Sequence, residues 1–308
     1  MTIFYDILII ALCIGALWYG ALLVVDSASR IALKLGMSEL VIGLTVVAFG
    51  TSAPEFAVTI SAAIRGHESM SVANVVGSNF FNLGFILGAV AVIRPIITTH
   101  KLVWRDGILL IASSLLLLLF LLDLTIERYE GFILIAILIA YLLFLFFKKE
   151  TIDDEEIIEK DFHWSDVPKF LAGLLLILAG GHFFVDSATR IAIVLGVSTW
   201  VIGATIVAAG TSAPELATSL VAVIKGKHGI SAGNLIGSDL FNLLGVLGLA
   251  ALIHPLDVEA SSLNSIFMLT GMVILVVIFI RSGWKVSRTE GSILIIINLI
   301  RWILDFMG

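Results

Sequence analysis

About ten windows of roughly 20 mostly apolar residues follow one another along the chain, and this is the length that an α-helix needs to cross a bilayer. Apolar residues make up 59% of the 308 residues and charged residues only 14%, which excludes an ordinary soluble domain. The chain is therefore predicted to be an all-α polytopic membrane protein with ten transmembrane helices. We place these helices at residues 3–25, 38–64, 71–93, 105–122, 130–147, 167–186, 198–224, 231–253, 262–280 and 290–307.

The second half of the chain repeats the first at an offset of 160 residues. The stretch VAFGTSAPEF at residues 47–56 returns as VAAGTSAPEL at 207–216, and NVVGSNFFN at 74–82 returns as NLIGSDLFN at 234–242. Roughly half of the positions from 26 to 95 are identical in both copies, which indicates an internal duplication. Equivalent points are five spans apart, and five is odd, so the second copy must cross the membrane in the opposite direction. We therefore expect two inverted-topology repeats of five helices.

A strongly charged segment divides the two copies. The chain is accordingly predicted to contain a first transmembrane repeat at 1–147, an acidic linker at 148–166 and a second repeat at 167–308. Lys and Arg fall mainly in the loops that follow spans 1, 3, 5, 7 and 9, and such loops face the cytoplasm. We expect a multi-pass protein of the cell membrane, with both termini outside and the linker in the cytoplasm.

The repeated GTSAPE motif combines a helix breaker with an ionisable side chain inside a predicted span. Pro54 has no amide hydrogen and clashes with the carbonyl of Gly50, so helices 2 and 7 are predicted to break at the two copies of the motif. Backbone carbonyls near the break, such as that of Ala48, are then expected to lack partners. Inside a membrane this is tolerated only where protein, water or ions supply those partners.

Oxygen-bearing side chains stand beside each predicted break. They are three or four residues apart and hence share one helical face. A charged Glu in mid-span costs about 2.5 to 3.5 kcal/mol, so an intramembrane carboxylate is by default functional. The six side chains are Thr51, Ser52 and Glu55 in the first copy and Thr211, Ser212 and Glu215 in the second.

A second matched set lies on spans 3 and 8. Ser78 and Asn82 are one helical turn apart, as are Ser238 and Asn242, so each pair can point toward the glutamates. Sets made only of oxygen ligands suit the hard cations Ca²⁺ and Na⁺. Neither GTSAPE motif contains His or Cys, which disfavours a zinc or copper site.

Three further aspartates lie in or near the predicted spans. Asp26 and Arg30, like Asp186 and Arg190, are spaced for ion pairs between residues i and i+4 near span ends. Asp239 breaks the match between the copies, since Asn79 is its equivalent. Its side chain either reaches the ion path or pairs locally, and the sequence leaves both alternatives open.

The GTSAPE motifs, together with GSNFFN and GSDLFN, resemble the two alpha-repeats of the calcium/cation antiporter superfamily, and of its sodium/calcium exchanger family in particular. The resemblance implies that Glu55 and Glu215 are the acidic ligands shared by Ca²⁺ and Na⁺, and that Asn82 and Asn242 line the middle of the site. The remaining ligands that it implies are the backbone carbonyls of Thr51, Thr211, Ala48 and Ala208 and the side chains of Ser52, Ser78, Ser212 and Ser238.

One departure from the family pattern matters. Some members, including potassium-dependent exchangers, carry Asp at one of the two positions that are Asn82 and Asn242 here, which weakens the case for potassium co-transport. The linker is also much shorter than the regulatory domain of eukaryotic members. The sequence is therefore similar to a minimal prokaryotic exchanger.

The function expected from these observations is Na⁺/Ca²⁺ antiport through one central site. Two alternatives stay open, namely a Ca²⁺/H⁺ antiporter that uses the same glutamates and a cation channel. An enzyme is not expected, because there is no nucleotide motif, nucleophile constellation or soluble domain. The expected partners are Ca²⁺, Na⁺ and the lipid bilayer, without nucleic acid or a resident cofactor, and a monomer would suffice for transport.

Overall fold

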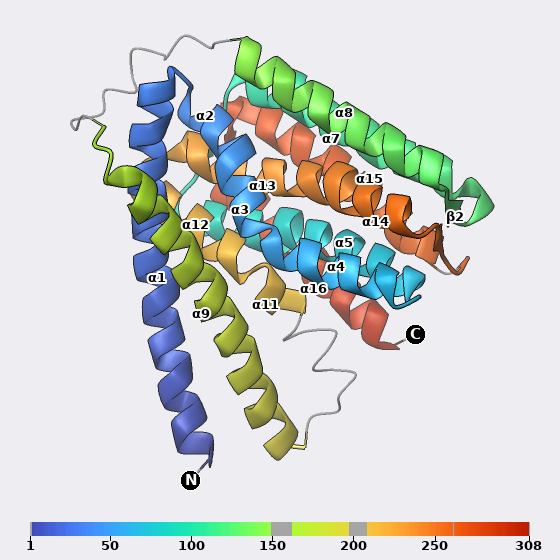
Figure 1. Ribbon diagram of the computed structural model, residues 1–308, viewed down its shortest axis with the longest axis horizontal. Helices are drawn as coiled ribbons and strands as arrows, with labels where there is room; N and C mark the ends of the chain where they lie inside the picture. The colour runs from blue at the N-terminus through green and yellow to red at the C-terminus, as the bar shows by residue number, and fades with distance from the viewer. Residues whose placement is uncertain (1, 149–161, 197–207, 261, 308) are drawn as a thin grey trace.

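The computed structural model describes residues 2–148, 162–196, 208–260 and 262–307, and almost all of them are helical (Figure 1). Short π-helical or 3-10 segments are labelled η. The first half contains α1 (Thr2–Leu35), α2 (Glu39–Ile42), η1 (Gly43–Val47), α3 (Ala48–Thr51), α4 (Ala53–Ile64), α5 (Glu68–Phe81), η2 (Asn82–Ile86), α6 (Leu87–Ile93), β1 (Ile96–Ile97), η3 (Leu102–Gly107), α7 (Ile108–Phe120), η4 (Leu121–Asp123), β2 (Thr125–Ile126) and α8 (Arg128–Phe147).

The second half follows a similar order. It contains α9 (Asp166–Val194), α11 (Ala208–Thr211), α12 (Ala213–Ile224), α13 (His228–Leu240), η6 (Phe241–Val246), α14 (Leu247–Ile253), β3 (Leu256–Asp257), α15 (Ser262–Arg281), η7 (Ser282–Trp284), β4 (Lys285–Val286) and α16 (Arg288–Met307).

Seven helices in the described part of the chain are long and apolar enough to cross a membrane, and an eighth is counted if the bent pair Glu39–Thr51 and Ala53–Ile64 forms one span. The predicted all-helical membrane architecture is thereby confirmed. So is the break in helix 2, where the two parts of the pair meet at 50°. The predicted span 198–224 and linker 148–166 lie partly outside the described residues, and the total of ten spans stays a prediction.

Two long helices stand apart from a compact group formed by the others. In Figure 1, α1 and α9 run side by side away from that group, and they approach closely where Gly20 meets Gly173. A Cβ atom on either glycine would lie 2.8 Å from the carbonyl oxygen of the other. Within the group, the spans Glu68–Ile93 and His228–Ile253 are the most enclosed, with 72% and 83% of an apolar 18-residue window buried. These two spans therefore form the centre of the fold.

Two short strand pairs connect the two halves of the chain. β1 pairs with β4 and β2 pairs with β3, both antiparallel, so each pair takes one strand from each half. Adding 160 to the numbers of β1 and β2 gives the positions of β3 and β4, so the two pairs make equivalent connections. The halves are thus joined twice by the same contact.

The predicted i,i+4 ion pairs, Asp26 with Arg30 and Asp186 with Arg190, are wrong. The four side chains reach other partners, three of them outside their own helix. Arg30 and Arg190 each meet an aspartate across the close contact between α1 and α9. Asp26 meets Lys225, the residue that caps the C-terminal end of α12. The observed pairs are Asp26 with Lys225 at 2.5 Å, Arg30 with Asp166 at 2.9 Å and Arg190 with Asp6 at 2.7 Å, while Asp186 lies 3.5 Å from His182.

Candidate cation-binding site

Both GTSAPE motifs interrupt a helix at their serine. Ser52 separates α3 from α4 and Ser212 separates α11 from α12, and both have ψ near zero (6° and 9°), outside the helical range. The proline lies in the first turn of the new helix, where its missing amide hydrogen costs nothing. Glu55 and Glu215 therefore also lie in a first helical turn, where the helix dipole favours negative charge.

The two glutamates bind the serines of the opposite motif. Ser52 Oγ donates a hydrogen bond to Glu215 Oε1 at 3.1 Å, and Ser212 Oγ donates one to Glu55 Oε1 at 3.3 Å. All four side chains are fully buried. The two breaks therefore face each other, and each carboxylate is held by the other half of the chain.

Helix α13 extends this cluster. Ser238 Oγ donates to Glu215 Oε1 at 3.3 Å and lies 3.4 Å from Thr51 Oγ1. Thr51 also donates to Asn234 Oδ1 at 3.0 Å, while the Asn234 amide nitrogen bonds Ser219 Oγ. Asn234 was not predicted as a site residue, although its match with Asn74 in the repeat was a signal that pointed to it.

The predicted role of the break in freeing carbonyls is wrong for Ala48. Its carbonyl oxygen accepts a hydrogen bond from the Ser52 amide at 3.0 Å, and Thr51 Oγ1 lies 3.3 Å from it. The reason is that α3 stays helical as far as Thr51, so the break falls one turn beyond Ala48. The role of this carbonyl as a cation ligand remains a prediction.

The other predicted residues lie on the elements expected of them. Ser78 is buried on α5, Ala208 begins α11, and Thr211 ends α11 beside the break. Asn82 and Asn242 are fully buried at the start of η2 and in η6. Their roles as ligands remain predictions.

Asp239, for which the sequence left two alternatives, lies in a layer of amides next to the glutamates. Its Oδ1 accepts a hydrogen bond from Asn82 Nδ2 at 3.1 Å, and its backbone oxygen accepts one from Asn79 Nδ2 at 3.1 Å. Asn242 Nδ2 donates to Asn79 Oδ1 at 2.9 Å. The sequence did not point to Asn79 as a site residue, because its hydrogen bonds depend on how the two halves pack.

The hydrogen bonds within this cluster leave several acceptor oxygens without a hydrogen-bond partner. Buried acceptors without partners are uncommon in proteins and need an explanation. Oxygen is the ligand of Ca²⁺ and Na⁺, and within the described residues no three His, Cys, Asp or Glu side chains gather to form another kind of metal site. The oxygens without a hydrogen-bond partner are Glu55 Oε2, Glu215 Oε2, Asn82 Oδ1, Asn242 Oδ1 and Asp239 Oδ2.

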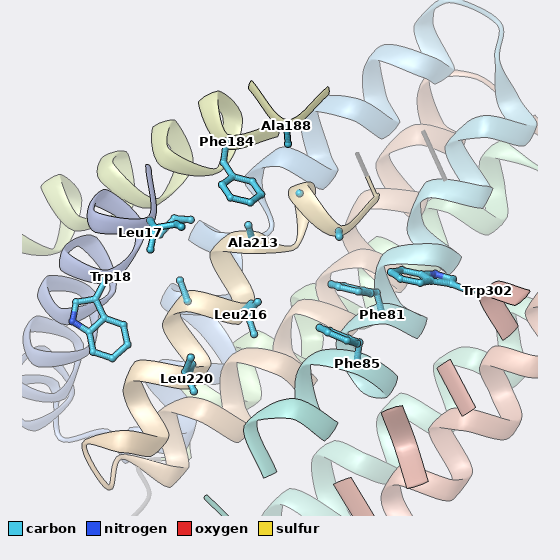
Figure 2. A pocket seen from close by; sticks show the side chains of 14 residues that line it. Leu17, Trp18, Phe81, Phe85, Phe184, Ala188, Ala213, Leu216, Leu220 and Trp302 are labelled. Atoms are coloured by element: carbon cyan, nitrogen blue, oxygen red, sulfur yellow. The ribbon is translucent and has the colours of Figure 1, made fainter. Parts of the chain in front are cut away.

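A cavity of about 630 Å³ among the described residues has a different character. Figure 2 shows that it is surrounded by apolar side chains from α1, α9, α12, the α5 to η2 region and α16, among them Trp18, Phe85 and Trp302. It offers no carboxylate, hydroxyl or amide side chain to a cation. The polar cluster between the two helix breaks is therefore the candidate site.

Comparison with known proteins identifies the family of the chain. The profile of a family described as sodium/calcium exchanger protein matches residues 5–147 and 167–301. The chain belongs to the sodium/calcium exchanger family. It is therefore related to membrane transporters that exchange cations.

Individual relatives span nearly the whole chain. The sodium/calcium exchanger MaX1 of Methanosarcina acetivorans is 34% identical, with 94% of this chain and 95% of the relative covered. The inner membrane protein YrbG of Escherichia coli is 32% identical, with coverage of 88% and 89%. A solved structure of the sodium-calcium exchanger NCX_Mj, soaked with zero Na⁺ and Ca²⁺, superposes with a TM-score of 0.85 at 29% identity and covers 97% of this chain and 98% of its own.

Proposed function

We propose that this member of the family exchanges Na⁺ for Ca²⁺ across the cell membrane, by alternating access to one central site built from both halves. The observation that carries the proposal is the pair of fully buried carboxylates, Glu55 and Glu215, each bonded through one oxygen to the opposite half and each with its other oxygen free of hydrogen bonds. A buried charge needs a compensating partner. A cation supplies it.

Shared ligands account for the coupling between the two ions. Two ionised carboxylates give the site a charge of about −2, which one Ca²⁺ or two Na⁺ neutralise. A third Na⁺ leaves an excess positive charge and makes exchange electrogenic. Since Ca²⁺ and the full set of Na⁺ need the same two carboxylates, they cannot bind together. An empty site, doubly charged, crosses the membrane poorly, and this prevents leak.

The other ligands are proposed from the resemblance of the two motifs to those of the family and from their equivalent positions in the two copies. Asn82 and Asn242 line the middle, and the hydroxyl groups complete flanking Na⁺ sites. The proposed set beside the two glutamates and two asparagines is Thr51, Thr211, Ser52, Ser212, Ser78, Ser238 and the carbonyls of Ala48 and Ala208.

We further propose that the chain consists of two inverted repeats of five spans, 1–147 and 167–308, joined by the linker 148–166. Two kinds of contact support this arrangement, because each occurs a second time between the equivalent residues of the opposite halves. Ser52 to Glu215 and Ser212 to Glu55 are one such pair, and the strand pairs β1–β4 and β3–β2 are another. The distribution of Lys and Arg supports extracellular termini and a cytoplasmic linker. One copy of the chain carries every proposed ligand, so a monomer suffices.

Ca²⁺ flux into proteoliposomes under separately imposed gradients tests the function. We expect an outward Na⁺ gradient to drive ⁴⁵Ca²⁺ uptake, and outward K⁺ or H⁺ gradients of the same size to leave it near background. The hydroxyl-rich surroundings of both carboxylates favour Na⁺ as the coupling ion, because each hydroxyl adds a neutral oxygen ligand.

Two results would contradict Na⁺/Ca²⁺ exchange. Uptake driven by a pH gradient in the complete absence of Na⁺ would make the protein a Ca²⁺/H⁺ antiporter. Ca²⁺ flux that continues without any counter-gradient, and is unaffected by one, would make it a channel. Liposomes without protein give the background in each case.

A further inference from the structure

The amide layer beside the glutamates consists of two equivalent pairs of residues. Asn79 and Asp239 occupy matching positions in the two copies, as do Asn82 and Asn242, and all four side chains are fully buried. Each proposed ligand, Asn82 or Asn242, donates its amide nitrogen to the non-ligand residue of the opposite half. The layer therefore has the same cross-linked plan as the serines and glutamates.

The directions of the hydrogen bonds in this layer follow from two oxygen atoms of Asp239 that accept, one in the side chain and one in the backbone. An asparagine amide presents a donor on one side and an acceptor on the other, so its neighbours decide which side faces where. Oδ1 of Asp239 accepts a hydrogen bond from the amide nitrogen of Asn82, so the nitrogen of Asn82 faces Asp239. The backbone carbonyl of Asp239 also accepts only, and therefore the nitrogen of Asn79 must face that oxygen.

The hydrogen bond from Asn79 to the backbone of Asp239 also determines how the other proposed ligand, Asn242, is oriented. The amide nitrogen of Asn79 donates to the backbone oxygen of Asp239, so Asn79 presents its Oδ1 to Asn242. The amide nitrogen of Asn242 therefore donates to this Oδ1. In both proposed ligands, the amide nitrogen then faces a residue of the opposite half of the chain. The side-chain oxygens of Asn82 and Asn242 are left without hydrogen bonds, while both nitrogens are used.

We propose that Asn79 and Asp239 are positioning residues that hold the carbonyl oxygens of Asn82 and Asn242 toward the transported cations. This inference rests on the proposed exchange function. An amide turned the other way would present its NH₂ group, which carries positive partial charge, to a cation. The two residues thus set cation affinity through the amides that they orient.

The proposal predicts which substitutions at residue 239 are harmful. Asp239→Leu has a similar branched shape but no acceptor, so it releases the Asn82 amide to rotate. Asp239→Asn keeps an acceptor, and Asn79 shows that an asparagine at the equivalent position serves its ligand in this way. Residues that orient metal ligands from behind typically contribute about 10- to 100-fold in affinity.

The test is the Ca²⁺ concentration for half-maximal, Na⁺-driven ⁴⁵Ca²⁺ uptake in proteoliposomes. We expect Asp239→Leu to raise this concentration about 10-fold or more, and Asp239→Asn to recover most of the loss. If Asp239→Asn were as impaired as Asp239→Leu, the charge of Asp239 and not its hydrogen bond would be what matters, and the proposal would be overturned. Normal affinity in Asp239→Leu would overturn it as well.

A second measurement applies if Asp239→Leu does not fold. Asp239→Ala is compared in the wild-type chain and in an Asn82→Ala background. A residue that acts through Asn82 has no further effect once Asn82 is gone, so we expect less than about a twofold change in that background. An equal loss in both backgrounds contradicts the proposal.

These outcomes are separate from the fate of the proposed function. If wild-type uptake does not depend on Na⁺, exchange itself fails before any variant is compared. If wild-type uptake depends on Na⁺ and Glu55→Gln is inactive, yet residue 239 tolerates leucine, only the positioning role fails.

Discussion

Glu55→Gln and Glu215→Gln are each expected to abolish Na⁺-driven Ca²⁺ uptake while the protein still folds. Glutamine keeps the shape of the side chain and an oxygen that can accept from Ser212 or Ser52, so the local hydrogen bonds survive. What is lost is one of two negative charges, and Ca²⁺ then faces a site that no longer balances it. We expect uptake to fall by about 100-fold or more, equivalent to about 2.7 kcal/mol.

The measurement is initial ⁴⁵Ca²⁺ uptake into proteoliposomes, with gel-filtration profile and thermal unfolding as checks on folding. Glu68→Gln serves as the matched control, because Glu68 lies at the start of α5, where it faces His254 and not the site. Its uptake should stay close to that of the wild type. Substantial exchange in both site variants would remove the basis of the proposed function.

The sequence predicted those parts of the site that depend on chain order and local chemistry. A proline in an apolar span must break the helix, and the observed break at Ser52 lies within the predicted motif. The duplication then predicted a second break, which lies at Ser212. Two intramembrane carboxylates in equivalent positions could be expected to meet, as Glu55 and Glu215 do through the serines.

What the sequence could not predict depends on distances between helices. The hydrogen bond from Thr51 to Asn234 joins residues 183 positions apart, and no local spacing encodes it. The same applies to Asp26, which binds Lys225 and not the arginine one turn along its own helix. The sequence showed that Asp239 and Asn79 differ, but their roles in orienting Asn82 and Asn242 follow only from the packing of the two halves.

Gly237→Ala is expected to have a large effect although it adds one methyl group. A Cβ atom at this position on α13 would lie 2.7 Å from the carbonyl oxygen of Leu44 and 2.8 Å from Ala48 Cβ. Neither can rotate away, because one is backbone and the other is attached directly to it. Contacts this short force the helices apart, and overpacking of this kind typically costs about 1 to 3 kcal/mol.

The separation would also disturb the cation site. Gly237 precedes Ser238, which bonds Glu215, while the opposing segment leads into Thr51, which lies 3.4 Å from Ser238. Moving α13 away from η1 and α3 therefore pulls on contacts from both halves at once. We expect Gly237→Ala to lower both the unfolding temperature in detergent and the apparent Ca²⁺ affinity.

Gly271→Ala provides the control for the effect of the methyl group itself. Gly271 lies in the interior of α15, and a Cβ atom there would have no atom of the described residues within 4 Å. Replacing a helical glycine by alanine in open space removes backbone freedom from the unfolded chain and is neutral or stabilising. If Gly237→Ala matched Gly271→Ala in unfolding temperature and in Ca²⁺ affinity, close packing of α13 against the broken helix would not be what holds the two halves of the site together.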